Sequence, residues 1–112
     1  MPFSAQPKAD ALVVKVHAKR LDARAAPEFK SKLTSLIQEG HTQLVVDMTQ
    51  VDFLDSSGLG AMIAGLKLLG GNGEIVLCGV NPKLMSLLKI TRVDKLFRLF
   101  ATPEEALTGL TT

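Results

Sequence analysis

The sequence predicts an α/β sandwich in which helices pack on a mixed, largely parallel sheet. Short apolar runs rich in β-branched residues alternate with segments whose apolar residues recur at helical spacing, as expected of strands joined by crossover helices. The chain has 112 residues, the size of one ordinary domain, and its 46% hydrophobic content suffices for one continuous core. We therefore expect residues 1–112 to form a single domain.

Two strands are expected to form a hairpin at the start of the chain. The segment from Leu12 to Ala18 is rich in β-branched residues and partly alternates between apolar and polar, which indicates a strand near a sheet edge. The stretch from Phe3 to Gln6 can pair with it, because the intervening Pro7 to Asp10 has turn chemistry.

Helices and buried strands alternate through the middle of the chain. Apolar residues recur at helical spacing from Pro27 to Glu39 and again from Leu59 to Leu69. A glycine follows each of these segments, as expected where a helix stops. The apolar runs from Leu44 to Met48 and from Ile75 to Val80 are typical of strands covered on both faces in a parallel sheet.

The last third of the chain carries helix-start signals. Asn81 and Pro82 suit the cap and first turn of a third helix. The residues from Phe97 to Phe100 are a candidate short strand. The segment from Thr102 to Glu105 has capping-box spacing, which predicts a final helical turn or two through Leu107.

The composition argues against nucleic-acid binding. The 13 basic and 11 acidic side chains leave a formal charge of only +2, which provides no basic field for phosphates. The five phenylalanines, the only aromatic residues, do not alternate with lysine or arginine to build a stacking surface for bases.

No metal site is expected. His17 and His41 lie far apart in the sequence, and the single cysteine, Cys78, has no partner at ligand spacing. Four acidic residues can be read either as paired carboxylates for acid–base or Mg²⁺ chemistry or, as we favour, as caps, turn residues and solvated charges. These four are Asp22, Asp47, Asp52 and Asp55.

The motifs of enzymes and cofactor sites are incomplete. The nucleophile pattern Gly-x-Ser-x-Gly is absent around Ser56 and Ser57. Gly58 and Gly60 begin a dinucleotide-binding fingerprint, but Ile63 occupies the position of its third glycine. We therefore expect neither an enzyme nor a bound cofactor.

The sequence favours a cytoplasmic protein without a membrane partner. The segment from Met1 to Lys8 has no signal pattern or lipidation motif, and no apolar stretch approaches the roughly 18 residues of a membrane span. Cys78 lies alone in an apolar run, which suits a reducing compartment.

The most informative segment is the turn Asp55-Ser56-Ser57-Gly58, between a predicted strand and a predicted helix. Capping of the helix explains one serine or aspartate there, but explains less well a run of three followed by two glycines. A hydroxyl on such a turn is within reach of a protein kinase. A phosphate would add about −1.5 to −2 charges beside the positive end of the helix.

A stripe of small residues continues from this turn along the predicted helix, on a face distinct from its core face. The stripe comprises Ala61, Ala64, Gly65 and Leu68. Small side chains let another backbone approach closely, so the stripe is either a partner-binding surface or the contact with a neighbouring helix of the same domain. The spacing alone favours neither.

Residues 45–60 resemble the central signature of STAS domains, in particular the bacterial anti-sigma factor antagonists. The quoted pattern is Val-Val-Asp-Met-Thr-x-Val-x-Phe-x-Asp-Ser-Ser-Gly-Leu-Gly. The resemblance continues in residues 20–28, in residues 90–97 and in residues 102–107. It implies a sheet of about four or five strands with about four helices, and a protein that acts by switching partners.

The resemblance also implies the partners. The unphosphorylated antagonist binds an anti-sigma factor that is also an ATP-dependent serine kinase, and thereby frees a sigma factor. Phosphorylation of the second serine, here Ser57, breaks the complex, and a serine phosphatase restores the unmodified form. Ser57 is therefore the implied phosphoacceptor.

Five further residues complete the implied site. Asp55, Ser56 and Gly58 shape the loop around the phosphoacceptor, and Asp22 comes from the adjacent loop as a partner contact. Asp47 is expected near the same edge of the sheet. Because one fold hosts several functions, the alternative is a STAS accessory or structural subunit of a transport or signalling assembly, in which the second serine only caps its helix.

Overall fold

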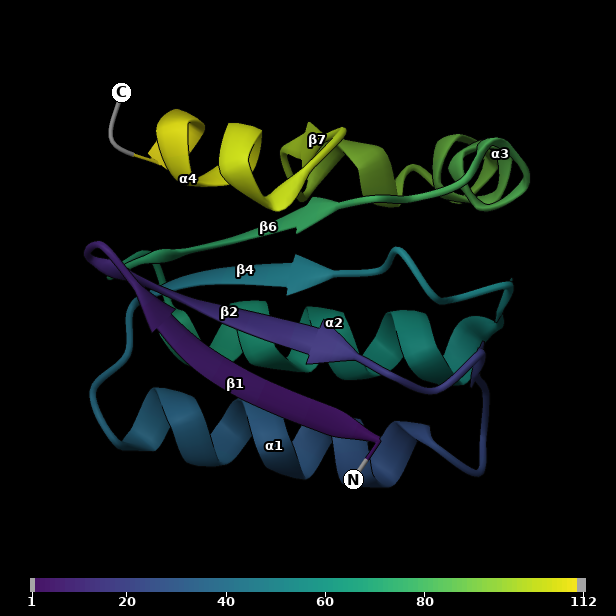
Figure 1. Cartoon of the computed structure of the whole chain (residues 1–112). Helices are drawn as coiled ribbons and strands as arrows, with labels where there is room; N and C mark the ends of the chain where they lie inside the picture. The colour runs from purple at the N-terminus through teal and green to yellow at the C-terminus, as the bar shows by residue number, and fades with distance from the viewer. Residues whose placement is uncertain (1, 111–112) are drawn as a thin grey trace.

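The computed structural model of the chain describes residues 2–110. Its main sheet has five strands in the order β1-β2-β4-β6-β7 (Figure 1). The strands are β1 (Phe3–Lys8), β2 (Ala11–Val16), β4 (Gln43–Asp47), β6 (Glu74–Cys78) and β7 (Leu99–Phe100). β1 pairs with β2 antiparallel, whereas β2–β4, β4–β6 and β6–β7 are parallel. The predicted mixed, largely parallel sheet and its N-terminal hairpin are confirmed.

Helices cover both faces of this sheet. α1 and α2 lie side by side on one face, and α4 lies on the other (Figure 1). The helices are α1 (Ala26–Gln38), α2 (Ser56–Leu69), α3 (Pro82–Ile90) and α4 (Pro103–Leu110), with a short 3₁₀ turn, η1 (Val93–Lys95), after α3. Each predicted helix is present, and α4 runs three residues beyond the predicted end. None of the helices in residues 2–110 has the length and apolar character needed to cross a membrane.

The central strands divide their side chains between two apolar layers. Alternate residues such as Val14 and Val46 face α1 and α2 in the main core, and Val45 and Val76 belong to a smaller cluster with Ala106 of α4. This two-sided burial explains why these strands read as continuous apolar runs. The layers hold the strand ends in place, and the candidate site is built at one of those ends.

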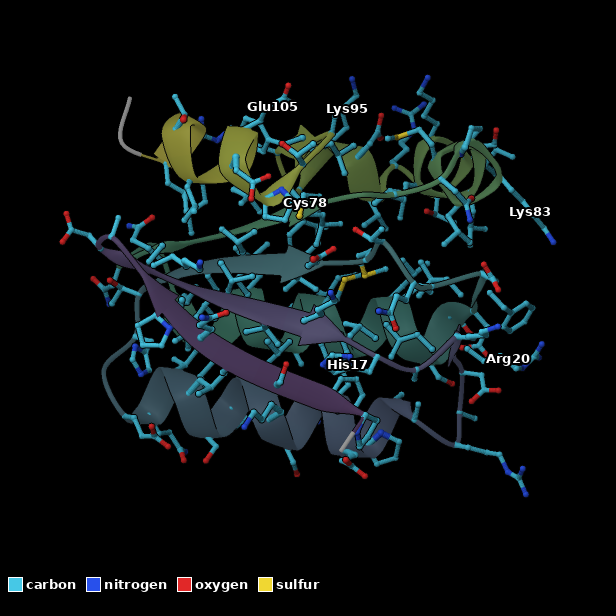
Figure 2. The ribbon with its side chains drawn as sticks, in the orientation of Figure 1. His17, Arg20, Cys78, Lys83, Lys95 and Glu105 are labelled. Carbon is cyan, nitrogen blue, oxygen red and sulfur yellow. The ribbon has the colours of Figure 1, made fainter. Side chains whose placement is uncertain are left out.

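Cys78 belongs to the smaller layer, between β6 and α4 (Figure 2). Burial raises the pKa of its thiol to about 12, and the nearby carboxylates of Asp47 and Glu104 add to the effect. The thiol therefore stays protonated at neutral pH and packs as a small hydrophobe.

Two very short strands lie outside the main sheet, and their pairing was not predicted. β3 (Arg20–Leu21) and β5 (Phe53–Leu54) form a parallel two-residue ladder that pairs Leu21 with Leu54. The residues that follow this pair are Asp22 and Asp55. The ladder thus brings together two loops that lie more than thirty residues apart in the sequence.

Candidate binding site at the start of helix α2

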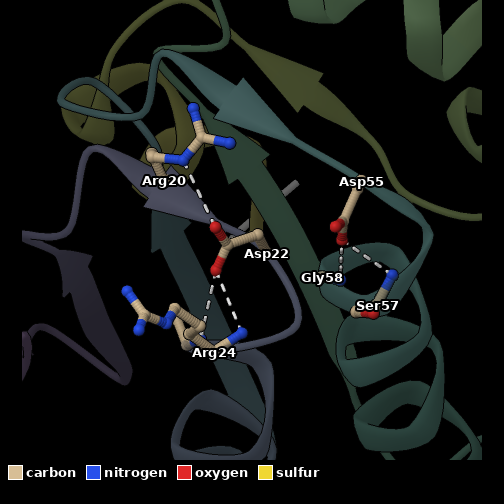
Figure 3. A network of polar contacts seen from close by, with 7 residues as sticks. Arg20, Asp22, Arg24, Asp55, Ser57 and Gly58 are labelled. Carbon is tan, nitrogen blue, oxygen red and sulfur yellow. Dashed lines mark hydrogen bonds and ion pairs between the residues drawn. The ribbon is translucent and has the colours of Figure 1, made fainter.

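Asp55 caps helix α2. Its backbone is extended, and its Oδ1 accepts hydrogen bonds from the N–H groups of Ser57 at 2.9 Å and of Gly58 at 3.3 Å (Figure 3). The carboxylate therefore satisfies two of the backbone donors that the first turn of a helix leaves unpaired. Sequence reasoning left open which residue of the turn is the cap, and the structure assigns that role to Asp55.

The Ser57 hydroxyl has no structural partner. The side chain is partly exposed, and within residues 2–110 neither it nor the exposed Ser56 hydroxyl makes a hydrogen bond to the protein. The hydroxyl of Ser57 is thus not required to cap α2, contrary to the alternative in which this serine only caps the helix. It is also not buried in the interior, where no enzyme could reach it.

Gly58 lets strand β3 lie directly against the first turn of α2. A Cβ at this position would lie 2.5 Å from the carbonyl oxygen of Leu21 and 2.7 Å from Cδ1 of Leu54. The contact with the Leu21 carbonyl is impossible for a real side chain unless the backbone moves, and the Leu54 side chain would also have to shift. The glycine is therefore required by close packing, which agrees with the prediction that Gly58 shapes the loop.

Asp22 organises the neighbouring loop, between β3 and α1. Its Oδ1 accepts the N–H of Arg24 at 3.0 Å and its Oδ2 accepts Nε of Arg20 at 3.2 Å (Figure 3). Its backbone carbonyl accepts the N–H of Ala26 at 2.8 Å, in the first turn of α1. The carboxylate is held in a fixed position beside the α2 turn and keeps part of its surface open to solvent.

The electrostatics of Asp22 favour its charged form. Desolvation acts to raise the pKa of the carboxyl group, but the N–H groups of Arg24 and Ala25 and the guanidinium of Arg20 together lower it below its usual value. The guanidinium of Arg20 also lies 4.0 Å from the ring centroid of Phe53, at the end of the molecule where the site lies (Figure 2). The guanidinium group of Arg20, from β3, thus packs on a side chain of β5.

A hollow of about 410 Å³ lies between the first turns of α1 and α2. Its lining is mostly small and apolar, with one hydroxyl and one charged side chain. The lining residues are Ala23, Ala26, Pro27, Lys30, Ser57, Gly60 and Ala61. Ser57 therefore lies at the border of an open, mostly apolar depression.

The small-residue stripe packs mainly inside the molecule. Ala61 and Gly65 are buried, and a Cβ at Gly65 would lie 3.3 Å from Cδ1 of both Leu33 in α1 and Ile75 in β6. Of the two alternatives left open by the spacing, the burial of Ala61 and Gly65 favours the packing of α2 on α1 and the sheet. Their contact with a partner stays a prediction, and Ala61 also lines the hollow beside Ser57. Ala64 is partly exposed, so its contact with a partner stays a prediction.

Asp47 has a structural role in its own turn. It is the only buried charged residue among residues 2–110, with 6% of its surface exposed. It accepts the N–H of Thr49 at 3.0 Å and the hydroxyl of the same residue. Asp47 is the last residue of β4, and its burial leaves little surface for a partner.

Sequence reasoning missed Lys30 and Arg24. Both are exposed cations near the start of α1, and Lys30 lines the hollow beside Ser57. One signal was available, because Ala26, Pro27 and Lys30 are spaced for one face of a helix. The position of that face relative to α2 depends on how the two helices pack, which the spacing does not specify.

Comparisons with known proteins agree with this fold and show the family. The STAS domain family model matches residues 3–106. An anti-sigma-B factor antagonist of Staphylococcus aureus is 32% identical over 80 residues, which are 70% of this chain and 74% of that protein. The crystal structure of an anti-sigma factor antagonist from Mycobacterium paratuberculosis superposes with a TM-score of 0.89 at 25% identity, covering 98% of this chain and 93% of that one.

A third comparison shows the fold alone. The Bacillus cell fate determinant SpoIIAA, solved in its phosphorylated form, has a TM-score of 0.72 at 22% identity and covers 95% of this chain and 96% of its own. The resemblance inferred from residues 45–60 is confirmed by these matches. The chain belongs to the STAS domain family.

Proposed function

We propose that this chain is an anti-sigma factor antagonist, a binding protein without enzymatic activity, whose association with its partner is controlled by phosphorylation of Ser57. The observation that carries the proposal is the state of the Ser57 hydroxyl. It is partly exposed, it is free of hydrogen bonds to residues 2–110, and it stands on a turn that Asp55 holds without its help. Modification of this hydroxyl therefore removes no interaction that the fold needs.

The partner is proposed to be an anti-sigma factor with serine kinase activity. In the phosphorylation step, Oγ of Ser57 attacks the γ-phosphorus of ATP, the bond from that phosphorus to the β–γ bridging oxygen breaks, and ADP leaves. The hydroxyl proton passes to a base of the kinase. A serine phosphatase reverses the modification by transferring the phosphoryl group to water. Because the kinase step draws on cytoplasmic ATP, the cytoplasm is the proposed location.

The charge of the phosphate explains the loss of binding. Unmodified Ser57 offers a partner a small neutral group beside the apolar hollow between α1 and α2. The phosphate adds about −1.5 to −2 charges at that place, next to the carboxylates of Asp22 and Asp55. A partner surface that closes on the neutral hydroxyl would have to desolvate this charge, which is unfavourable without new cationic contacts.

The remaining site residues have two proposed roles. Asp22 and Ser56 are accessible and contact the partner directly, as does the exposed edge of Ala64. Asp55 and Gly58 act indirectly, because they set the position of the first turn of α2.

Titration calorimetry with the serine-kinase anti-sigma factor of the same organism tests this function. We expect Ser57→Ala to bind as tightly as the unmodified protein and Ser57→Asp to bind at least about tenfold more weakly, since a like charge or unpaired buried charge at an interface costs over 1.4 kcal/mol. Incubation with the kinase and ATP should add one phosphoryl group at Ser57.

The adjacent serine provides the matched control. Ser56→Asp adds the same charge one residue away, on a more exposed side chain. We expect it to weaken binding less than Ser57→Asp and to leave phosphorylation at Ser57 intact. Equal affinity of the wild-type, Ser57→Ala and Ser57→Asp proteins would refute the proposed switch.

A further inference from the structure

Lys30 is the only charged residue that lines the hollow beside Ser57. It lies on the second turn of α1, is exposed, and forms no ion pair with any of residues 2–110. The other lining side chains are small or apolar and offer no charge. A negative group placed on Ser57 would therefore share this depression with one unpaired cation.

The direction of the helices brings the two groups together. The Cα–Cβ bonds of a helix tilt toward its N-terminus, so the long side chain of Lys30 runs back toward the first turn of α1. That turn contributes Ala26 and Pro27 to the hollow, on the side opposite Ser57. A lysine side chain has enough length and freedom to reach a phosphate at this level.

The residues that α2 contributes to the hollow after Ser57 are small. Gly60 lines it one turn after Ser57, and a Cβ built on Gly60 would meet no atom within 4 Å. Ala61, beside it, carries only a methyl group. Beyond Ser57, the α2 residues that line the hollow therefore carry no side chain larger than a methyl group.

The other charged groups around the turn do not occupy this place. Asp55 is engaged by the N–H groups of its own helix, and Asp22 is paired with Arg20. Arg24 is exposed but does not line the hollow. The two carboxylates repel a phosphate, which increases the benefit of a cation on the opposite wall.

We propose that Lys30 holds the phosphate of phospho-Ser57 inside the hollow by an ion pair between α1 and α2. This inference rests on the proposed phosphorylation of Ser57 and adds a mechanism to it. The phosphate enters the depression that the unmodified protein offers to a partner, and the ion pair holds it there. Phosphorylation then blocks the site by occupancy as well as by charge.

The test uses protein with phosphoserine incorporated at position 57 during translation, so that it does not depend on any kinase. The second ionisation of the phosphate is followed by ³¹P NMR as a function of pH at low salt. A nearby cation favours the dianion and lowers this pKa. We expect Lys30→Met to raise it by about half a pH unit relative to the parent, and Lys30→Arg to keep it low.

Two matched controls separate Lys30 from general charge effects. Lys32→Met removes the same charge from α1 at a residue that lines a different depression, with Phe3 and Ser35. Arg24→Met removes another exposed cation near the turn, which forms no ion pair with any of residues 2–110. We expect both variants to titrate like the parent, and the effect of Lys30 to shrink at 1 M salt because screening weakens exposed pairs.

The proposal is overturned if Lys30→Met titrates like the parent, or if Arg24→Met produces the larger change. These results are independent of the partner experiment. A ³¹P shift that depends on Lys30 supports the ion pair even if no kinase modifies Ser57. If the ³¹P titration does not depend on Lys30 while Ser57→Asp still binds the partner weakly, the ion pair is refuted and the proposed phosphorylation switch is retained.

Discussion

The starts of α1 and α2 lie side by side, yet they are built differently. α2 begins with a carboxylate cap, Asp55, directly before its first turn. The residue in the same place before α1 is Ala25, which has no side chain to accept a hydrogen bond, and Asp22 acts from three residues earlier instead. Because Asp55 alone caps α2, the hydroxyls of Ser56 and Ser57 are not needed for capping. The start of α1 contributes apolar residues and Lys30 to the lining of the hollow.

The two glycines of the α2 start give the largest expected contrast. Gly58→Ala puts a methyl group into the Leu21 carbonyl and should destabilise the fold by about 1–3 kcal/mol, as overpacking does. Gly60→Ala meets no atom and should stabilise it by about 0.5–1 kcal/mol, because alanine is the better helix former. Urea unfolding measures both. Equal changes in the free energy of unfolding for the two substitutions would show that β3 does not pack closely against Gly58.

The cap of α2 gives the next effect. Asp55→Ala should cost about 0.5–2 kcal/mol of stability, because the N–H groups of Ser57 and Gly58 lose their acceptor. Asp55→Asn, which keeps an acceptor oxygen, should lose less. Thermal unfolding checks the order, with Ser56→Ala as a control that removes a hydroxyl without a partner. A loss in Ser56→Ala as large as that in Asp55→Ala would contradict the assignment of the cap.

The start of α1 gives the smallest effect, and it depends on pH. The folded-state pKa of Asp22 is lower than its ordinary value of 3.8, so its ionised form stabilises the fold at neutral pH. This contribution is present above 3.8 and disappears as the pH falls through the lowered folded-state value. Wild-type protein and Asp22→Asn should therefore differ in urea midpoint at pH 7 and converge in strong acid. A constant difference between pH 7 and pH 2 would contradict it.

The long elements could be predicted because their patterns are repeated many times. Each central strand is covered on two faces, and each helix buries one stripe of apolar residues. The spacing of apolar residues along the sequence therefore reveals these elements. The β3–β5 ladder has two residues per strand, too few for any period. It was missed for that reason, although it is what sets Asp22 beside Asp55.

The small-residue stripe is a second feature whose role the sequence could not predict. Ala61 and Gly65 have the size that any close contact requires, and the sequence cannot distinguish a partner from a neighbouring helix. The structure favours the neighbouring elements, because Leu33 of α1 and Ile75 of β6 already lie against Gly65. Ala64 and the end of the stripe at Leu68 are its more exposed parts.

The sequence by itself determined the fold class, the family and the turn that carries Ser57, because these depend on periodicity and on a contiguous motif. Tertiary structure alone decided that Asp55 rather than a serine caps α2, that Asp47 is buried, and that Lys30 shares a hollow with Ser57. The physical reason differs between these cases. The burial of Asp47 and the facing of α1 and α2 depend on segments distant along the chain, which local residue patterns do not encode. The cap of α2 is a local contact, but three adjacent residues can each accept N–H groups of the first helical turn, and the residue pattern does not choose among them.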